Sequence, residues 1–414
     1  MSINSDKRVK VYAALPVLNE LENLPVVISN ILEQEDVDFE LIVCVNQPNE
    51  WHENEDKVSI CHNNKLAIEY LESLEDNRIT VIDKSTKGNG WIGRNHGVGW
   101  ARMTAMDRAS AKAGDDDIIV SIDADTYYTS DYFRAVTDAF EHFPAAAGLS
   151  VPYYHPLTGN EVNDRCILRY ELYMRNYALN MLLINNPYSF SAIGSGMACK
   201  GSMYRKVRGL TPKMSGEDFY FVQKLRKAGK IIIDCEEVIY PASRFSDRVY
   251  FGTGPAIIKG AAGNWESYPV YAQDLFLDIK ATFDLFPILF DKEVSTPMDD
   301  FLKKCFKIDI GELWKPLKTN CRDKASFIKA ATQKVDGLRI LQFLKDSNST
   351  DHGTEEHKLA SFIINNLNPS IELHEAIDHL LTYGFENAPI SSLNLIRDLM
   401  FVNERRMQKQ YGMV

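Results

Sequence analysis

Short β-rich runs alternate with helical patterns through the first part of this chain, and that alternation restricts the fold more than any other feature of the sequence. Apolar runs with the length of buried strands lie at 9–15, 39–45, 79–83 and 117–122. Segments with helical periodicity lie between them, at 20–34, 66–74 and 94–113. The pattern predicts βαβ units and an α/β domain built on a mostly parallel sheet. Because ligands of such sheets bind at the carboxyl ends of the strands, we expect functional residues there.

The later part of the chain changes character. Helices are expected at about 165–183 and 219–228, and from about residue 264 onward the periodicity is mainly helical. At 414 residues the chain is also too long for a single core of ordinary size. We therefore expect two parts, an α/β domain over 1–264 and a helical C-terminal region over 265–414.

The charge balance and hydropathy exclude several kinds of partner. Lys and Arg number 46 against 57 Asp and Glu, a formal net charge of −11, which repels nucleic acids and anionic bilayers. The most apolar late stretch, 275–290, is interrupted by charged residues and by Pro287, and it falls short of the roughly 20 apolar residues that span a bilayer. We expect no nucleic-acid partner and no transmembrane segment, and peripheral contact with a membrane stays open.

The cysteines indicate neither a disulfide framework nor a zinc site. Seven are scattered along the chain without any Cys-x-x-Cys pair, so a zinc ribbon or a redox dithiol is not expected. The polar first ten residues also lack the apolar core of a signal peptide. Reduced thiols and the absence of a leader predict a cytoplasmic protein.

Two polar segments follow predicted strands. Pro16, Asn19 and Glu20 come directly after the first strand, where Asn19 could also serve as a helix cap. After the fourth strand, Asp123 and Asp125 are separated by one residue, which places both carboxylates on one side of an extended chain. Two carboxylates at that spacing can hold a divalent cation that in turn binds a diphosphate. The alternative is local turn chemistry, since aspartate often hydrogen-bonds its own backbone after a strand.

A pair of acidic residues, Glu217 and Asp218, opens the helix expected at 219–228. Acidic side chains are favoured at a helix N-terminus by the helix dipole alone. The functional alternative makes Asp218 a general base that deprotonates an acceptor hydroxyl.

Two basic segments have the composition of phosphate-binding loops. Three glycines between residues 88 and 93 match the dinucleotide pattern G-x-G-x-x-G, but they equally suit a flexible loop that brings Arg94 to a phosphate at a helix start. Arg244 and Arg248 lie before a glycine-rich turn and could bind phosphate in the same way, or lie in a solvated loop.

The order of these segments along the chain is more informative than any one of them. A strand followed by P-x-x-N-E, a K-G…G-R-N-x-G loop, a strand followed by D-A-D, and G-E-D at a helix start occur in that order. The arrangement resembles the family 2 glycosyltransferases of the GT-A fold and covers about residues 8–260. The resemblance implies a Rossmann-like catalytic domain that binds a nucleotide sugar.

The resemblance also implies roles for individual residues. Asp218, paired with Glu217, stands in the place of the catalytic base of inverting members, and Asp125 with Asp123 would bind a divalent metal, Mn²⁺ or Mg²⁺. Where the family often carries an aspartate after the second strand, this chain has Asn46, which can still hydrogen-bond a uracil. Together with the basic candidates, the expected nucleotide-sugar-binding residues are Pro16, Asn19, Glu20, Asn46, Arg94, Asp123, Arg244 and Arg248.

The activity expected from the resemblance is inverting hexosyl transfer from a nucleotide sugar, with UDP as the first choice of nucleotide. The acceptor would be a carbohydrate, a lipid-linked molecule or a small molecule with a free hydroxyl. Two alternatives stay open. A sugar-nucleotide nucleotidyltransferase would use similar acidic residues but release pyrophosphate, and a non-catalytic relative would bind the nucleotide sugar without turning it over.

Overall fold

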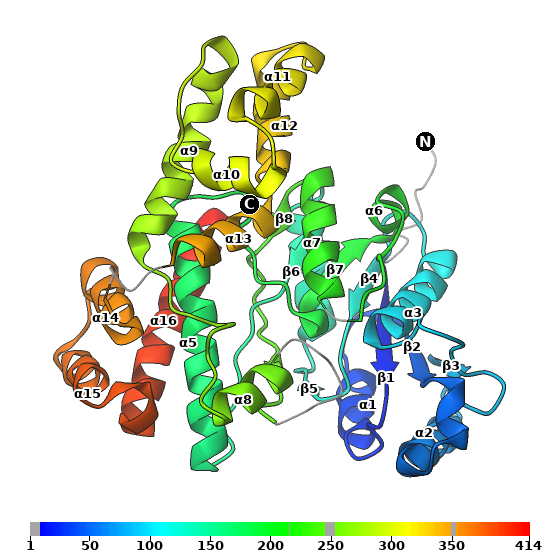
Figure 1. Cartoon of the computed structure of the whole chain (residues 1–414). Helices are drawn as coiled ribbons and strands as arrows, with labels where there is room; N and C mark the ends of the chain where they lie inside the picture. Colours follow the sequence, from blue (N-terminus) through cyan, green and yellow to red (C-terminus); the bar gives the residue numbers. More distant parts are fainter. Residues whose placement is uncertain (1–8, 215, 245–252, 349–352) are drawn as a thin grey trace. The chain divides into compact units, whose positions relative to one another are not determined.

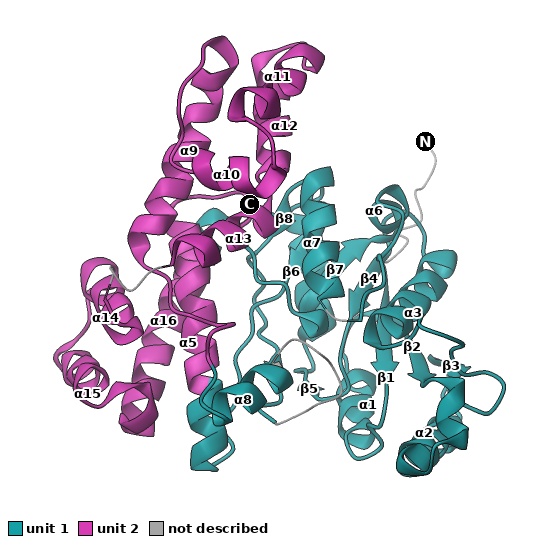
Figure 2. Ribbon diagram, in the orientation of Figure 1, with its two compact units in different colours: residues 1–167, 190–264, 408–414 teal, residues 168–189, 265–407 magenta. Residues whose placement is uncertain are grey.

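The computed structural model describes residues 9–214, 216–244, 253–348 and 353–414 (Figure 1). The chain forms two compact units (Figure 2). The first comprises residues 1–167, 190–264 and 408–414, and the second comprises residues 168–189 and 265–407. The functional division expected at residue 264 stays a prediction.

The first unit is built on a seven-stranded sheet with the strand order β3-β2-β1-β4-β7-β6-β8. Neighbouring strands are parallel except at β7, which is antiparallel to both β4 and β6. The predicted α/β class with a mostly parallel sheet is thus confirmed. The strands are β1 (Lys10–Val17), β2 (Asp38–Asn46), β3 (Ile79–Lys84), β4 (Ile118–Ser121), β6 (Gly148–Ser150), β7 (Met197–Lys200) and β8 (Ile231–Ile232), with β5 (Thr126–Tyr127) and β9 (Tyr240–Pro241) forming a separate pair.

The central strand β1 is a near-continuous buried run, as expected for a parallel strand covered on both faces. It extends two residues beyond the predicted end at residue 15, and Pro16 lies inside it opposite Cys44 of β2. Pro16 has no N–H to donate, but the ladder between β1 and β4 already ends at Ala14. Proline is tolerated here because that side of β1 has no further partner strand.

Helices flank this sheet (Figure 1). Two 3₁₀ turns and the first residues of α2 precede the helical segment expected at 66–74. Polar residues such as the buried Asn64 hide the helical pattern there. Helix α4 was not anticipated, although it buries Phe133, Val136 and Phe140 on one face. The helices with residues in this unit are α1 (Leu24–Leu32), α2 (Val58–Ser73), α3 (Val98–Lys112), α4 (Tyr132–His142), α5 (Glu161–Leu183), α6 (Gly201–Lys206), α7 (Glu217–Ala228), α8 (Thr253–Ala261) and α16 (Ile390–Tyr411).

The second unit is helical, which confirms the predicted helical C-terminal region. In the described parts of the chain, no helix combines the length and the apolar character needed to cross a membrane. Besides residues of α5 and α16, the unit contains α9 (Gln273–Asp291), α10 (Asp299–Phe306), α11 (Ile310–Asn320), α12 (Lys324–Lys334), α13 (Gly337–Ser347), α14 (Glu355–Asn366) and α15 (Ile371–Asn387).

Helix α3 packs both against the sheet of the first unit and against the segment that precedes α7. It packs against β1, β2 and β4. Near its start, Gly99 touches the backbone of Lys213, and a Cβ added to Gly99 would lie 2.2 Å from the Lys213 carbonyl oxygen. Glycine is required here by close approach of two backbones, which places the segment before α7 directly against α3.

We predict that Gly99→Ala destabilises the first unit by roughly 2 kcal/mol or more, because the added methyl group overlaps backbone that cannot rotate away. Urea denaturation monitored by circular dichroism would measure the loss. Gly311→Ala is the matched control: no atom lies within 4 Å of the added Cβ in α11, so this change should raise helix stability by about 0.5–1 kcal/mol. Equal stability of Gly99→Ala and the wild type would contradict the close packing.

Candidate active site

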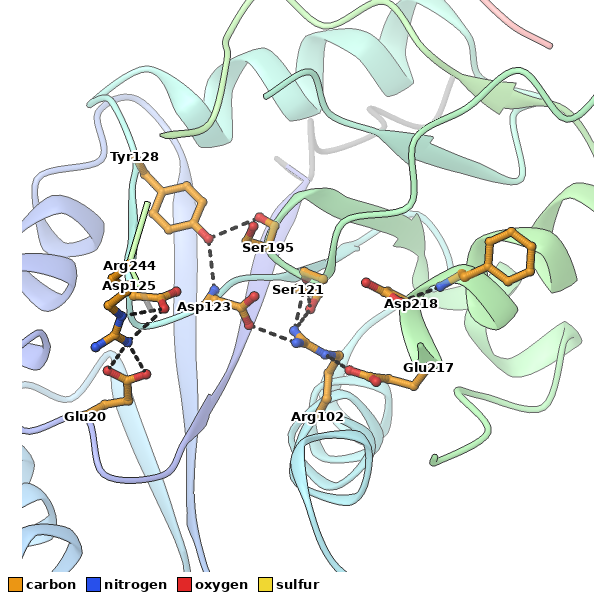
Figure 3. A network of polar contacts seen from close by, with 12 residues as sticks. Glu20, Arg102, Ser121, Asp123, Asp125, Tyr128, Ser195, Glu217, Asp218 and Arg244 are labelled. Carbon is orange, nitrogen blue, oxygen red and sulfur yellow. Dashed lines mark hydrogen bonds and ion pairs between the residues drawn. The ribbon is translucent and has the colours of Figure 1, made fainter. Parts of the chain in front are cut away.

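The residues predicted to carry chemistry gather at the carboxyl edge of the sheet. Strands β1, β2 and β4 run parallel, so the segments that follow them meet at one edge. Glu20 follows β1, Asn46 is the last residue of β2, and Asp123 follows β4. The N-terminus of α7, which begins at Glu217, contacts the same group of side chains (Figure 3).

Asp123 lies in a turn that the Tyr128 hydroxyl holds in place. Its N–H donates to the Tyr128 hydroxyl at 3.0 Å, and that hydroxyl donates to the carbonyl oxygen of Ser195 at 3.1 Å. Its carboxylate oxygen Oδ1 accepts a hydrogen bond from Nη2 of Arg102 at 2.9 Å. Burial raises the pKa of Asp123, against the attraction of Arg102. The carboxylate therefore lies in a defined place with a cation beside it.

Asp125 belongs to a second, separate cluster. Nη2 of Arg244 lies 2.8 Å from Oδ2 of Asp125 and 2.8 Å from both carboxylate oxygens of Glu20. Glu20 is buried, at 7% exposure, and Arg244 is 35% exposed in its side chain. Burial lowers the pKa of Arg244, but Asp125 and Glu20 outweigh that effect and raise it. Three residues far apart in the sequence are thus joined by one guanidinium group (Figure 3).

The chemistry of this second cluster is suited to a divalent cation. Carboxylate oxygens are hard donors of the kind that Mg²⁺ and Mn²⁺ prefer, and such ions take one or two carboxylates together with substrate phosphates. Asp125 and Glu20 already converge on one positively charged group. Among the described residues, no three His, Cys, Asp or Glu side chains form a ready-made metal site.

Glu217 and Asp218 are the first two residues of α7, after Gly216 in the left-handed conformation (φ 74°). Glu217 is buried and accepts from Nε of Arg102 at 3.0 Å. Asp218 is half-buried and accepts from the backbone N–H of Phe219 at 2.7 Å. Burial and the neighbouring Glu217 charge raise the pKa of Asp218 to about 7, despite that hydrogen bond. A carboxyl with this pKa can exchange a proton near neutral pH.

Arg102 lies at the centre of the site and was missed by the sequence analysis. It is 3% exposed, and it donates to Ser121 Oγ at 2.6 Å and to the carbonyl oxygen of Gly194 at 3.0 Å, in addition to its two carboxylate partners. A signal was present: Arg102 occupies the face of α3 that otherwise buries Ala101, Ala105 and Met106. A charged residue on an apolar helical stripe indicates a buried ion pair.

The polar residues at the ends of β1 and β2 form a network of their own. Asn46 is buried; its Nδ2 donates to the carbonyl oxygen of Val17 at 2.9 Å, and its Oδ1 accepts from Trp91 Nε1 at 3.1 Å. Asn19 is exposed, with φ 56°, and its backbone N–H donates to Oδ1 of Asn64 at 2.8 Å. It does not cap α1, which begins only at Leu24. Roles of Pro16, Asn19 and Asn46 in nucleotide binding stay predictions.

The two remaining arginines stand apart from these clusters. Arg94 is exposed in a turn before α3, and within the described ranges no hydrogen bond or ion pair ties it to the other site residues. Arg248 lies outside the described residues. The glycine-rich loop packs on the chain after β2, where Trp91 N–H donates to the carbonyl oxygen of Gln47 at 2.9 Å. A Cβ on Gly90 would lie 2.8 Å from Cα of Asn49, so close packing explains this glycine.

Several solved structures resemble the chain at low sequence identity. TarS residues 1–349 from S. aureus, in complex with UDP-GlcNAc, is 11% identical, with 79% of this chain and 91% of that chain covered and a TM-score of 0.40. The mannosyltransferase PcManGT from Pyrobaculum calidifontis, in complex with GDP-Man and Mn²⁺, is 13% identical, with 97% and 88% covered and a TM-score of 0.41. A mycobacterial protein is 16% identical, with 62% and 76% covered and a TM-score of 0.34. No curated protein sequence matches the chain.

A family model described as glycosyl transferase family group 2 matches residues 118–265. The matched segment contains four of the acidic site residues and Arg244, whereas Glu20, Asn46 and Arg102 precede it. The resemblance predicted from the order of the motifs is therefore confirmed. Residues 118–265, which carry the D-A-D and E-D motifs, thus match the group 2 family of glycosyltransferases.

Proposed function

We propose that the chain is an inverting hexosyltransferase that moves a sugar from a nucleoside diphosphate sugar to the hydroxyl of a carbohydrate, lipid-linked or small-molecule acceptor. UDP is the proposed nucleotide. Glycosyl transfer itself follows from the family of residues 118–265. The observation that supports the finer proposal is Asp218, a half-buried carboxyl at the start of α7 whose pKa is raised to about 7.

In the proposed reaction Asp218 is the general base. One of its carboxylate oxygens takes the proton of the acceptor hydroxyl while the acceptor oxygen forms a bond to the anomeric carbon. The bond from that carbon to the β-phosphate oxygen breaks on the opposite face, and the nucleoside diphosphate leaves with the electron pair. A single displacement of this kind inverts the anomeric configuration. Base catalysis by a positioned carboxylate contributes about 10²–10⁴-fold to the rate.

The leaving diphosphate carries the charge that the site must stabilise. A divalent ion, Mn²⁺ or Mg²⁺, held by Asp125 and Asp123 would neutralise that charge, and Glu20 supplies a further carboxylate beside Asp125. Arg244 presents its guanidinium group at the same position and can pair with phosphate oxygens. Arg102 holds Glu217 in place through an ion pair, and Glu217 raises the pKa of the adjacent Asp218.

We predict that Asp218→Asn lowers kcat by about 10²–10⁴-fold, because the amide cannot accept the acceptor proton. Affinity for the nucleotide should stay nearly unchanged. Release of nucleoside diphosphate measures turnover, and isothermal titration with UDP and Mn²⁺ measures binding. In the wild type, kcat should rise with pH and level off above about pH 7, where Asp218 is deprotonated. Asp116→Asn, an exposed change before β4 at the other end of that strand, is the control and should leave kcat unaltered. Normal turnover by Asp218→Asn would exclude it as the base.

The proposed metal predicts that EDTA abolishes transfer and that Mn²⁺ restores it. The binding of donor can be followed without turnover, since a ligand that binds only the folded protein raises its apparent stability. A thermal-shift panel of UDP-, GDP- and dTDP-sugars should show a rise in Tm that requires Mn²⁺ and is smaller in Asp125→Asn. Full activity after chelation, or shifts of equal size with and without Mn²⁺, would refute the metal.

The raised pKa of Asp218 also predicts how stability depends on pH. The folded chain keeps the Asp218 proton up to about pH 7, while the ordinary value for the unfolded chain is 3.8. Between these values the native state binds more protons than the unfolded state, so stability falls as pH rises. Asp218→Asn removes this effect, and its Tm should exceed that of the wild type at pH 8 and approach it near pH 4. Differential scanning calorimetry at both pH values tests this, and a gain confined to pH 4 would contradict the shift.

A further inference from the structure

The side chain of Arg102 is one of the most buried charged groups in the first unit, with 3% of its surface exposed. It is the fifth residue of α3, on a face that elsewhere carries glycine, alanine and methionine. Among the described residues, its side chain has four hydrogen-bond partners, all on other segments of the chain: Ser121, Asp123, Gly194 and Glu217.

Stability alone does not account for this arrangement. Removing a guanidinium group and two carboxylates from water is costly, and buried ion pairs are often no more stabilising than apolar residues of the same size. What such a group does provide is geometry, because its planar array of N–H donors fixes each partner in a set direction. Nε points to Glu217, Nη1 to Ser121 and Gly194, and Nη2 to Asp123.

The partners of Arg102 are the segments on which the reaction depends. Ser121 ends β4 and Asp123 belongs to the D-A-D turn, while Glu217 is directly joined to the proposed base Asp218. Among the described residues, the Phe219 N–H is the one hydrogen-bond donor to the Asp218 carboxylate. The position of Asp218 therefore follows from the backbone at Glu217, which Arg102 anchors (Figure 3).

The surroundings leave the guanidinium group little freedom. A Cβ added to Gly194 would lie 2.6 Å from Nη2 of Arg102, so the Gly194 backbone closes one side. Gly99, one turn earlier in α3, contacts the Lys213 backbone and holds the helix against the approach to α7. Arg102 also lies before the segment that matches the family model, and none of the motifs in the sequence includes it.

We propose that Arg102 is a positioning residue for glycosyl transfer, which sets the separation of Asp218 from the D-A-D turn by holding Glu217 and Asp123 on one guanidinium group. The inference rests on the proposed function of Asp218 as the base. Arg102 touches neither donor nor acceptor in this role. Its loss should therefore reduce the rate of the chemical step more than the binding of donor.

The test compares Arg102→Gln, Arg102→Lys, Glu217→Gln and the double variant Arg102→Gln/Glu217→Gln in the full chain. Release of nucleoside diphosphate from UDP-, GDP- and dTDP-glucose with Mn²⁺ gives kcat and the donor KM. A misplacement of about 1 Å can cost 10²-fold in rate, so we expect Arg102→Gln to lower kcat by about that factor while KM changes far less. Arg102→Lys, which keeps the charge but not the planar fork, should recover part of the loss.

The double variant separates positioning from a general effect on the fold. If Arg102 acts through Glu217, removing both should cost little more than removing Arg102 alone, because coupled residues are not additive. Additive losses would overturn the inference, as would equal changes in kcat and KM. Arg205→Gln is the matched control: this arginine on α6 is 40% exposed and pairs with Asp115, and its loss should leave kcat unchanged.

The outcomes also distinguish this inference from the proposed function. A normal kcat for Arg102→Gln alongside an inactive Asp218→Asn overturns the positioning role alone. An active Asp218→Asn alongside an inactive Arg102→Gln overturns the base. If Arg102→Gln does not fold, judged by loss of a cooperative thermal transition, Glu217→Gln and Arg102→Lys decide: a fall in kcat at unchanged KM supports the role, and wild-type kcat in both overturns it.

Discussion

The candidate site depends on one buried guanidinium group, whose single positive charge lies among three carboxyl groups. Arg102 carries a single positive charge and binds both Asp123 and Glu217, and Asp218 adds a third carboxyl to the same surroundings. In a medium of low polarity the surplus negative charge is unfavourable, so one carboxyl must hold its proton more tightly. Burial, and after it the neighbouring Glu217, raises the pKa of Asp218 to about 7 against the attraction of Arg102. Burial raises the pKa of Asp123 as well, although Asp123 contacts Arg102 directly.

The two aspartates of the D-A-D motif have different partners. Asp123 turns to Arg102, whereas Asp125 turns to Arg244 and Glu20 (Figure 3). Arg102 belongs to α3, which packs against β1, β2 and β4, and its side chain is only 3% exposed. The side chain of Arg244 is 35% exposed. The first aspartate is thus part of a rigid framework, and the second faces a cation that solvent reaches. The two aspartate side chains are themselves equally accessible, at 28% exposure for Asp123 and 27% for Asp125, so a ligand can reach either carboxylate.

The parts of this structure that follow from local pattern were predictable, and those that follow from long-range packing were not. The four strands of the parallel core were placed within two residues, since near-continuous apolar runs are characteristic of them. The acidic motifs were found because they come directly after strands or open a helix. Helix α2 was placed eight residues late, because Asn64 is polar yet buried against the ends of β1 and β2. Arg102 was missed although its place on an apolar helical stripe indicates burial, because its four partners among the described residues lie 19 to 115 residues away in the sequence.

The charges of the described site also affect how a negatively charged donor can bind. Five carboxyl groups are gathered around two arginines, so the site is acidic, as the whole chain is at −11. A nucleoside diphosphate carries negative charge of its own and would be repelled by this arrangement. Proton uptake by Asp218 removes only one of the five negative charges, and Arg244 is already engaged by two carboxylates. In the proposed reaction, a divalent cation that enters with the donor would offset this repulsion, because it would pair with the phosphates and with the carboxylates at once.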